Sequence, residues 1–288
     1  MRQGCGHMQG KVCIVTGSSS GIGKATAEGL AKLGARVIMV VRNQQRGEEA
    51  RSEIIKNSGN DSVDLLLCDL ASMSDIKKLA DVFLSRYSRL DVLINNAGAV
   101  FDEREVTVDG FERTLAVNYL APFLLTRELL TILKTSAPAR VINLTSGLHV
   151  RGRVDFEDLQ SERHYSGMSA YANAKLMVLM FTYELAKRLN GTGITVNAVH
   201  PGFVATNLGR NTGSKRSSVM FGMMRPFQIS PQKAAETPVY LASSPEVQEM
   251  TGRYWSKMQE RRSSEASYDR ETQERLWTVT EDLISPKV

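Results

Sequence analysis

Residues Lys11-Val-Cys-Ile-Val-Thr16 run directly into Gly17-Ser-Ser-Ser-Gly-Ile-Gly23. The first segment is a short apolar run typical of a buried strand, and Lys24 to Leu33 continues with a helical pattern. Glycines at such a turn let the backbone approach a pyrophosphate, whose charge is attracted to the N–H groups at the start of the helix. The stretch therefore predicts a dinucleotide-binding turn, with an ordinary strand-to-helix turn as the alternative. Its spacing, Thr-Gly-x-x-x-Gly-x-Gly, differs from the common Gly-x-Gly-x-x-Gly.

Strand-like and helix-like segments alternate from Lys11 to Lys257, which predicts a parallel sheet with helices on both faces. We expect an α/β fold, a single Rossmann-like, doubly wound domain over residues 10–288 that follows an N-terminal tail at residues 1–9. Its central parallel sheet has about seven strands. After the first strand, the expected strands are Ala35–Val41, Ser62–Cys68, Leu90–Ile94, Arg140–Leu144, Ile194–His200 and Gly252–Ser256.

A second informative stretch is Tyr171-Ala-Asn-Ala-Lys175, inside a run from Ser169 to Leu189 that reads as one helix. Residues four apart lie on the same helix face, so the Tyr171 hydroxyl and the Lys175 ammonium can serve one site. We expect the positive charge to lower the pKa of Tyr171 below the free value of about 10, which suits a proton-transfer role. The alternative is a half-buried tyrosine beside a solvated lysine.

The composition is that of a globular protein, since 42% of the 288 residues are hydrophobic and 23% are charged. The net charge of +5 forms no Lys/Arg block, so nucleic acid is not an expected partner. Three cysteines fit a reducing compartment, and the four histidines show no metal-ligand spacing, so no metal is expected. Residues 1–8 lack the apolar segment of a signal peptide, and no apolar run is long enough to span a bilayer. We expect a cytoplasmic protein.

The stretch from Gly209 to Gln228 interrupts the alternation, opening polar and turning apolar at Val219–Met224. Because ligands bind at the carboxyl ends of the strands in this fold, and this insert follows the sixth strand, we expect a substrate lid around residues 207–228 with a methionine-rich lining. An amphipathic surface helix on the core is one alternative. Peripheral contact of its apolar face with a membrane is another.

The glycine turn, read with Tyr171 and Lys175, resembles the classical short-chain dehydrogenase/reductase family. Further motifs follow in the family's order across Gly10 to Leu283: Asp69 after the third strand, Asn95-Asn-Ala-Gly98 after the fourth, Asn118 in Val-Asn-Tyr, Ser146 after the fifth, and Pro201-Gly202 after the sixth. Taken singly, Asp69 could be only a helix cap, and Asn95-Asn96 only turn chemistry.

The resemblance implies hydride transfer between a nicotinamide cofactor and a carbonyl carbon. Tyr171 would exchange the proton of the substrate oxygen, and Ser146 would hydrogen-bond the same oxygen. Lys175 would lower the pKa of Tyr171 and bind the nicotinamide ribose, and Asn118 would hold a water that links Lys175 to solvent. The catalytic residues implied are Asn118, Ser146, Tyr171 and Lys175, with Ser146 and Tyr171 contacting substrate. The cofactor-binding residues implied are Gly17, Ser19, Ser20, Gly21, Ile22, Gly23, Arg42, Asp69, Leu70, Asn96, Ala97, Gly98, Tyr171, Lys175, Pro201, Gly202, Val204 and Thr206.

The end of the second strand indicates which cofactor is preferred. Enzymes that use NAD place a carboxylate there to hold the ribose 2′-hydroxyl, whereas this chain has Val41 followed by Arg42. A guanidinium can bind the 2′-phosphate of NADP through paired, charge-assisted hydrogen bonds. We therefore expect NADP (NADPH) rather than NAD, with Arg42 as a solvated loop charge the alternative.

Several strings are similar to the retinol dehydrogenase branch of the family, among them Thr145-Ser-Gly-Leu-His149, Asp158-Leu-Gln160 and Arg275-Leu-Trp277. This similarity implies a small lipophilic aldehyde, ketone or alcohol as substrate. The chain lacks the N-terminal membrane anchor of many members, which leaves a retinoid substrate open. Two other functions were considered: a catalytically idle nucleotide-binding regulator or scaffold, and a sugar-nucleotide epimerase. The epimerase is disfavoured because it expects Thr-Gly-x-x-Gly-x-x-Gly.

The helix that carries Tyr171 is apolar nearly all round, from Leu176 to Leu185, so it is expected to be buried on more than one side. No later segment stands out as a cover for its outer face. We therefore expect a homodimer or homotetramer in which this helix and the one around Asn118 to Leu133 pack against their symmetry mates. The helical pattern from Arg270 to Leu283, folded back over this surface, is the alternative.

Overall fold

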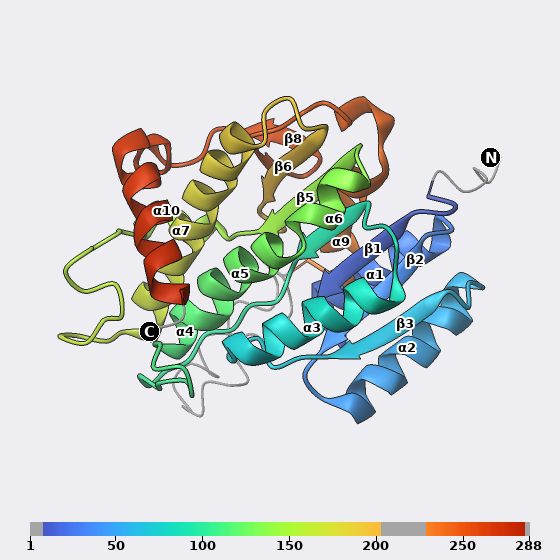
Figure 1. The fold of residues 1–288 in the computed structure, drawn as a ribbon, viewed down its shortest axis with the longest axis horizontal. Coiled ribbons are helices and arrows are strands. Elements are labelled where there is room, and N and C mark those ends of the chain that lie inside the picture. Colours follow the sequence, from blue (N-terminus) through green and yellow to red (C-terminus); the bar gives the residue numbers. More distant parts are fainter. Residues whose placement is uncertain (1–7, 203–228, 286–288) are drawn as a thin grey trace.

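The computed structural model describes residues 8–202 and 229–285. Within these ranges one sheet has the strand order β3-β2-β1-β4-β5-β6-β7-β8 (Figure 1). The expected α/β, Rossmann-like fold is confirmed, because the strand order reverses between β1 and β4 and the strands from β3 to β7 are parallel. The strands are β1 (Val12–Thr16), β2 (Arg36–Val41), β3 (Val63–Leu67), β4 (Val92–Asn95), β5 (Ala139–Leu144), β6 (Ile194–Val199), β7 (Arg253–Ser256) and β8 (Gln259–Arg261).

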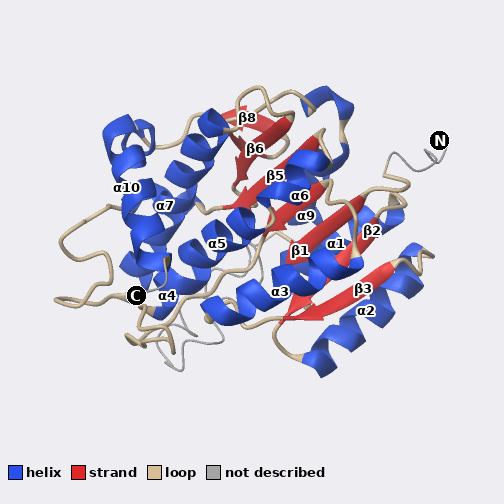
Figure 2. Ribbon diagram, in the orientation of Figure 1, coloured by secondary structure: helices blue, strands red, loops and turns tan. Residues whose placement is uncertain are grey.

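Helices cover both faces of the sheet (Figure 2). On one face the core includes residues of α1 (Gly21–Lys32), α2 (Gln44–Ser58) and α9 (Pro231–Ser243). On the other it includes residues of α3 (Met73–Arg86), α5 (Ala121–Glu128) and α7 (Gly167–Arg188). Strands buried on both faces are apolar at successive positions, which explains the unbroken apolar runs in the sequence. The other α-helices among the described residues are α4 (Arg113–Leu115), α6 (Leu130–Thr135) and α10 (Arg270–Ile284).

The sheet has one strand more than the expected seven, because β8 pairs antiparallel with β7. Strand β8 lies in the polar stretch from Gln259 to Arg270, and all three of its residues are exposed. Its sequence therefore has no apolar pattern. A short 3₁₀ helix, η6 (Glu265–Tyr268), lies in the same stretch. An edge strand whose side chains are in water gives no signal of burial, and this is why it was missed.

The helix expected around Asn118 to Leu133 is not continuous. A π-helical segment, η1 (Ala116–Leu120), precedes α5, and α6 follows after a break at Leu129. The side-chain amide of Asn118 donates to the carbonyl oxygens of Thr114 and Ala99, at 2.9 and 2.8 Å. Single-turn π segments inside helices are frequent at functional sites. Helix α1 begins at Gly21, three residues before the expected start, and α7 begins at Gly167, two residues before it.

The outer face of α7 is covered by α10, so the premise of the homodimer prediction is wrong. The Trp277 ring of α10 packs against Phe123 and Phe181, with centroid distances of 4.8 and 6.0 Å. The Tyr119 hydroxyl lies 2.7 Å from the Thr280 hydroxyl. The sequence pattern showed that α10 had apolar residues but not which surface they would meet.

Two further expectations concern the insert and the membrane. The lid expected around residues 207–228 falls entirely outside the described residues. Across residues 8–202 and 229–285, no helix has the length and apolar character needed to cross a bilayer.

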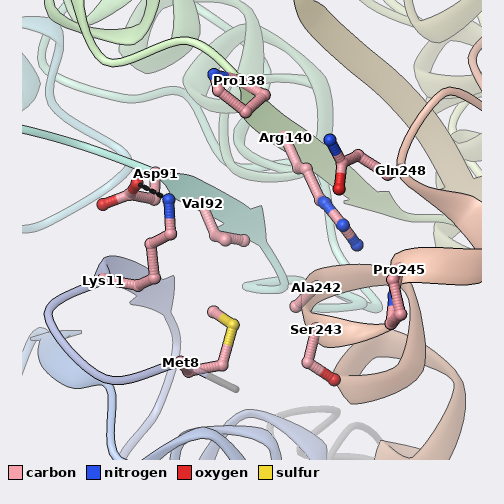
Figure 3. A pocket seen from close by; sticks show the side chains of 10 residues that line it. All are labelled: Met8, Lys11, Asp91, Val92, Pro138, Arg140, Ala242, Ser243, Pro245 and Gln248. Atoms are coloured by element: carbon pink, nitrogen blue, oxygen red, sulfur yellow. Dashed lines mark hydrogen bonds and ion pairs between the residues drawn. The ribbon is translucent and has the colours of Figure 1, made fainter. Parts of the chain in front are cut away.

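The amino ends of β1 and β4 are joined by the buried carboxylate of Asp91, which lies at the edge of the pocket in Figure 3. Its oxygens accept from the Lys11 ammonium at 2.8 Å, from the Val12 backbone N–H at 2.9 Å and from the Arg89 guanidinium at 2.6 and 2.8 Å. Burial alone would raise the pKa of Asp91, but these hydrogen bonds outweigh it and hold the pKa below its usual value.

We expect Asp91→Asn to lower the free energy of unfolding at pH 7 by about 2 kcal/mol, because the ionised acceptor of three donors is lost. A carboxyl whose folded pKa is depressed stabilises the fold above its unfolded pKa, and that stability is lost as pH falls through the folded pKa. The difference between wild type and variant should therefore shrink below about pH 4. Urea unfolding at pH 7 and below pH 4 measures the difference in the free energy of unfolding. The substitution Asp81→Asn, at an exposed aspartate, is the control. Equal stability of wild type and Asp91→Asn at pH 7 would contradict this.

Candidate active site

The glycine turn forms one wall of a cleft at the carboxyl ends of the strands. Gly17 and Gly21 have φ values of +66° and +56°, which side chains disfavour. A Cβ on Gly23 would lie 2.4 Å from the Gly17 carbonyl oxygen, so the turn closes too tightly for any side chain there. The helix that follows, α1, has no acidic residue in its first turn. Its positive end can therefore attract a phosphate.

The loop after β4 is bonded directly to this turn. The Thr16 hydroxyl oxygen accepts the backbone N–H groups of Asn96 and Ala97, at 2.9 and 3.0 Å. The Asn96 side chain donates back to the Thr16 carbonyl oxygen at 2.7 Å. A Cβ on Gly17 would lie 2.9 Å from the Ala97 Cα, so the two loops touch. Asn96 thus acts by joining the loops.

Between these loops lies a cavity of about 280 Å³. It contains most of the residues that the family resemblance assigned to the cofactor. Those that line it are Gly17, Ser19, Ser20, Gly21, Ile22, Gly23, Arg42, Asp69, Leu70, Asn96, Ala97 and Gly98. Of the remaining assignments, Tyr171, Lys175, Pro201 and Gly202 do not line this cavity. Val204 and Thr206 lie outside the described residues.

The cavity also has residues that the sequence reasoning missed. Arg46, in the first turn of α2, lines it together with Arg42, and neither guanidinium forms an ion pair with another described residue. Two cations and no carboxylate at the end of β2 fit a dinucleotide with an additional phosphate. The spacing of four between Arg42 and Arg46 was the available signal. Phe101 and Val117 also line the cavity, and nothing in the sequence indicated that they would.

The catalytic candidates come together at one end of this cavity. A Cβ on Gly98 would lie 2.9 Å from the Asn118 Oδ1 and 3.2 Å from the Lys175 Nζ. Asn118 is fully buried, and its Oδ1 accepts the Ala99 N–H at 3.2 Å. The Lys175 ammonium donates to the Leu144 carbonyl oxygen at 3.0 Å, at the end of β5. Gly98 therefore keeps the space between cavity and catalytic residues free of side chains.

Ser146 and Tyr171 complete the group. Ser146 precedes the 3₁₀ helix η2 (Gly147–Arg151), and its hydroxyl oxygen accepts the Leu148 N–H at 3.3 Å. Tyr171 lies one turn before Lys175 on α7 and is 6% exposed, and the Ser146 side chain is close enough to act on the pKa of its hydroxyl. The structure thus brings together all four residues expected to be catalytic.

The expected lowering of the tyrosine pKa is wrong in this structure. Burial raises the pKa of Tyr171 to about 12, although the hydrogen bond with Ser146 acts in the opposite direction. Burial also lowers the pKa of Lys175 to about 8. The Lys175 ammonium lies over the face of the tyrosine ring, 5.5 Å from its centroid. Desolvation disfavours the charged form of both side chains and exceeds their mutual attraction.

The sequence profile of the short chain dehydrogenase family matches residues 11–217. Among curated proteins, the chain is 43% identical to retinol dehydrogenase 13 of Mus musculus over 280 residues, which cover 96% of this chain and 84% of that protein. It is 42% identical to retinol dehydrogenase 12 of Homo sapiens over 278 residues, which cover 96% of this chain and 87% of that protein.

Solved structures show the same fold. An uncharacterized protein from Mycobacterium Paratuberculosis matches with a TM-score of 0.79 and 31% identity, over 97% of this chain and 95% of that one. The Pseudomonas aeruginosa RhlG/NADP active-site complex matches with a TM-score of 0.70 and 26% identity, over 88% of this chain and 96% of that one. The chain therefore belongs to the short-chain dehydrogenase family, as an oxidoreductase related to the retinol dehydrogenases.

Proposed function

We propose that this protein is an NADP(H)-dependent oxidoreductase that interconverts a lipophilic aldehyde or ketone and its alcohol. The observation that carries the proposal is the meeting of Asn118, Lys175 and Gly98 at the end of a glycine-walled cavity, with the Ser146 side chain close enough to the Tyr171 hydroxyl to affect its pKa. Two neighbouring hydroxyls beside a nucleotide cleft can orient a carbonyl oxygen and supply its proton.

The roles of the side chains follow from their protonation. When bound, the nicotinamide supplies or accepts the hydride. With its pKa raised to about 12, Tyr171 is protonated at neutral pH and can donate to a carbonyl oxygen. Ser146 donates a second hydrogen bond that stabilises charge on that oxygen. Lys175, held by the Leu144 carbonyl and with a pKa of about 8, is still largely cationic at pH 7 and stabilises a tyrosinate once it forms.

The preference for NADP(H) is supported by Arg42 and Arg46, which line the cavity at the end of β2 where NAD-dependent enzymes place a carboxylate. The retinol dehydrogenase relatives support a lipophilic substrate. Measuring NADPH oxidation over a panel of aldehydes, ketones and retinal, with NADH in parallel, tests both proposals. A cytoplasmic location stays a prediction from the sequence.

A catalytically idle nucleotide-binding regulator or scaffold is the alternative from another class. Such a protein would bind NADPH but turn over none of the carbonyls in the panel. The assembled Asn118, Ser146, Tyr171 and Lys175 favour the enzyme, because a scaffold has no need for a buried lysine beside a buried tyrosine.

The first prediction concerns proton transfer. Tyr171→Phe removes the donor hydroxyl and keeps the buried aromatic ring, so kcat should fall by about 10³-fold or more while the dissociation constant of NADPH changes little. Steady-state kinetics and NADPH fluorescence measure the two quantities. Tyr240→Phe, which removes the hydroxyl that donates to the Glu246 carboxylate at the surface, is the control. Turnover by Tyr171→Phe within tenfold of wild type would exclude the assigned role.

The second prediction concerns cofactor choice. Arg42→Ala and Arg46→Ala should each raise KM for NADPH by about tenfold, because a charge-assisted hydrogen bond to the extra phosphate is lost. KM for NADH should stay nearly unchanged, since NADH lacks that phosphate. Lys56→Ala, near the far end of α2, is the matched control. Equal losses with both cofactors would mean that the arginines act on the fold.

The third prediction concerns assembly. The homodimer or homotetramer prediction rests on an uncovered outer face of α7, and α10 supplies a cover for that face within the chain. We therefore propose a monomer with a mass near 31.9 kDa. Light scattering at micromolar concentration measures it. A clean dimer mass would show that a different surface associates, and a Trp277→Ala variant that dimerises while wild type does not would confirm the role of α10.

A further inference from the structure

One peptide group, the one that joins Ser146 to Gly147, is held at both ends by histidines. The Ser146 carbonyl oxygen lies 2.7 Å from the His149 Nδ1. The Gly147 N–H donates to the His200 Nδ1 at 3.1 Å. This peptide directly follows the candidate catalytic serine. Neither histidine has a role in the mechanism derived above.

The partners of His149 determine which nitrogen carries its proton. Its Nε2 accepts the Ser264 backbone N–H at 3.1 Å, so the proton of the neutral ring is on Nδ1 and is donated to the Ser146 carbonyl. The side chain is 2% exposed, and its ring lies edge-on to Tyr254 of β7 at a centroid distance of 5.2 Å. His149 therefore connects the serine loop to the segment that follows β8.

His200 has the opposite tautomer. Its Nδ1 accepts a hydrogen bond, so the proton of the neutral ring is on Nε2. A Cβ on Gly147 would lie 3.2 Å from that Nε2, so the peptide rests directly on the ring. Burial lowers the pKa of His200 to about 4 and also lowers the pKa of His149. Both rings are therefore neutral at pH 7, as the two hydrogen bonds require.

Holding this peptide fixes the serine itself. Ser146 has φ −146° and ψ 153°, and ψ is the rotation that sets the plane of the Ser146–Gly147 peptide. Because this peptide is hydrogen-bonded at its C=O and at its N–H, its plane cannot rotate without breaking a hydrogen bond on each side. The backbone of Ser146, and with it the direction of its Cα–Cβ bond, is thereby restrained.

We propose that His149 and His200 are positioning residues that together hold the Ser146 hydroxyl in its hydrogen-bonding direction through the Ser146–Gly147 peptide. The proposal rests on the proposed function, because it assigns the histidines to the step in which Ser146 binds the substrate oxygen. Neither histidine touches the reacting atoms. Their effect should appear in kcat, and the cofactor cavity, which neither of them lines, should be unaffected.

The test replaces each ring with and without its hydrogen-bonding atom. The Ser146 carbonyl oxygen also accepts the His149 backbone N–H at 3.1 Å, so His149→Phe removes only the side-chain bond to that oxygen. His200→Leu removes the bond that the Gly147 N–H donates. Each variant should lower kcat by about 10- to 100-fold, as small misplacements of catalytic groups do. The dissociation constant of NADPH should stay unchanged. In His149→Asn the amide nitrogen can donate to the Ser146 carbonyl, and in His200→Asn the amide oxygen can accept the Gly147 N–H. These variants should recover kcat to within about threefold of wild type.

The exposed His164→Phe is the matched control, and thermal unfolding checks that each variant is folded. If His149→Phe does not fold, His200→Leu decides, because it breaks the other bond to the same peptide. Full kcat in a folded His149→Phe or His200→Leu variant would overturn the proposal. So would equal losses in the Asn and the Phe or Leu variants, because the hydrogen bond would then be irrelevant.

A double-mutant cycle separates positioning from a general effect on the fold. In a Ser146→Ala background the serine hydroxyl is absent, so adding His149→Phe should lower kcat by less than about threefold. A further loss as large as in the wild-type background would show that His149 does not act through Ser146. Different results would contradict the proposed function itself: wild type that turns over no carbonyl, or a fully active Tyr171→Phe variant. Full activity of His149→Phe in a working enzyme overturns only the positioning role.

Discussion

The joint between Thr16 and Asn96 is the constraint on which the site depends. One hydroxyl oxygen accepts two backbone N–H groups from the loop after β4, and the Asn96 amide bonds the Thr16 carbonyl in return. This joint lies where the strand order reverses between β1 and β4, so it connects the two halves of the sheet at their carboxyl ends. Loops that leave a sheet in opposite directions open a crevice there. The joint fixes how far that crevice opens.

Close backbone contacts connect this joint to the catalytic group. Gly98 follows Asn96 and Ala97 and lies against both Asn118 and Lys175. Asn118 in turn bonds the backbone of Ala99 through its amide oxygen and nitrogen. Because each contact involves backbone or a buried amide, little rotational freedom remains between the dinucleotide turn and the lysine. The cleft and the proton-transfer group therefore form one rigid unit.

Much of this could be predicted because the signals are local. The strands buried on both faces are unbroken apolar runs, and the glycine turn, Asn96 and the Tyr171–Lys175 pair are short motifs on successive elements. What could not be predicted depends on three-dimensional surroundings. Strand β8 is exposed and shows no pattern of burial. The sequence around Trp277 shows an apolar residue on α10 but not that its ring packs on Phe123. The direction of the Tyr171 pKa shift depends on how much water burial removes, which a spacing of four residues does not contain.

The two pKa values at the centre of the site imply an order of proton movement. Tyr171, with a pKa of about 12, is the weaker acid, and Lys175, with a pKa of about 8, is the stronger one. A tyrosinate left after proton donation is therefore a strong enough base to be reprotonated at the expense of the Lys175 ammonium. Burial produces this order by disfavouring charge on both groups, without any carboxylate among the partners of Lys175 that the described structure contains. Desolvation raises the pKa of Tyr171 instead of lowering it. For the same reason Tyr171 stays protonated until a substrate oxygen takes the proton.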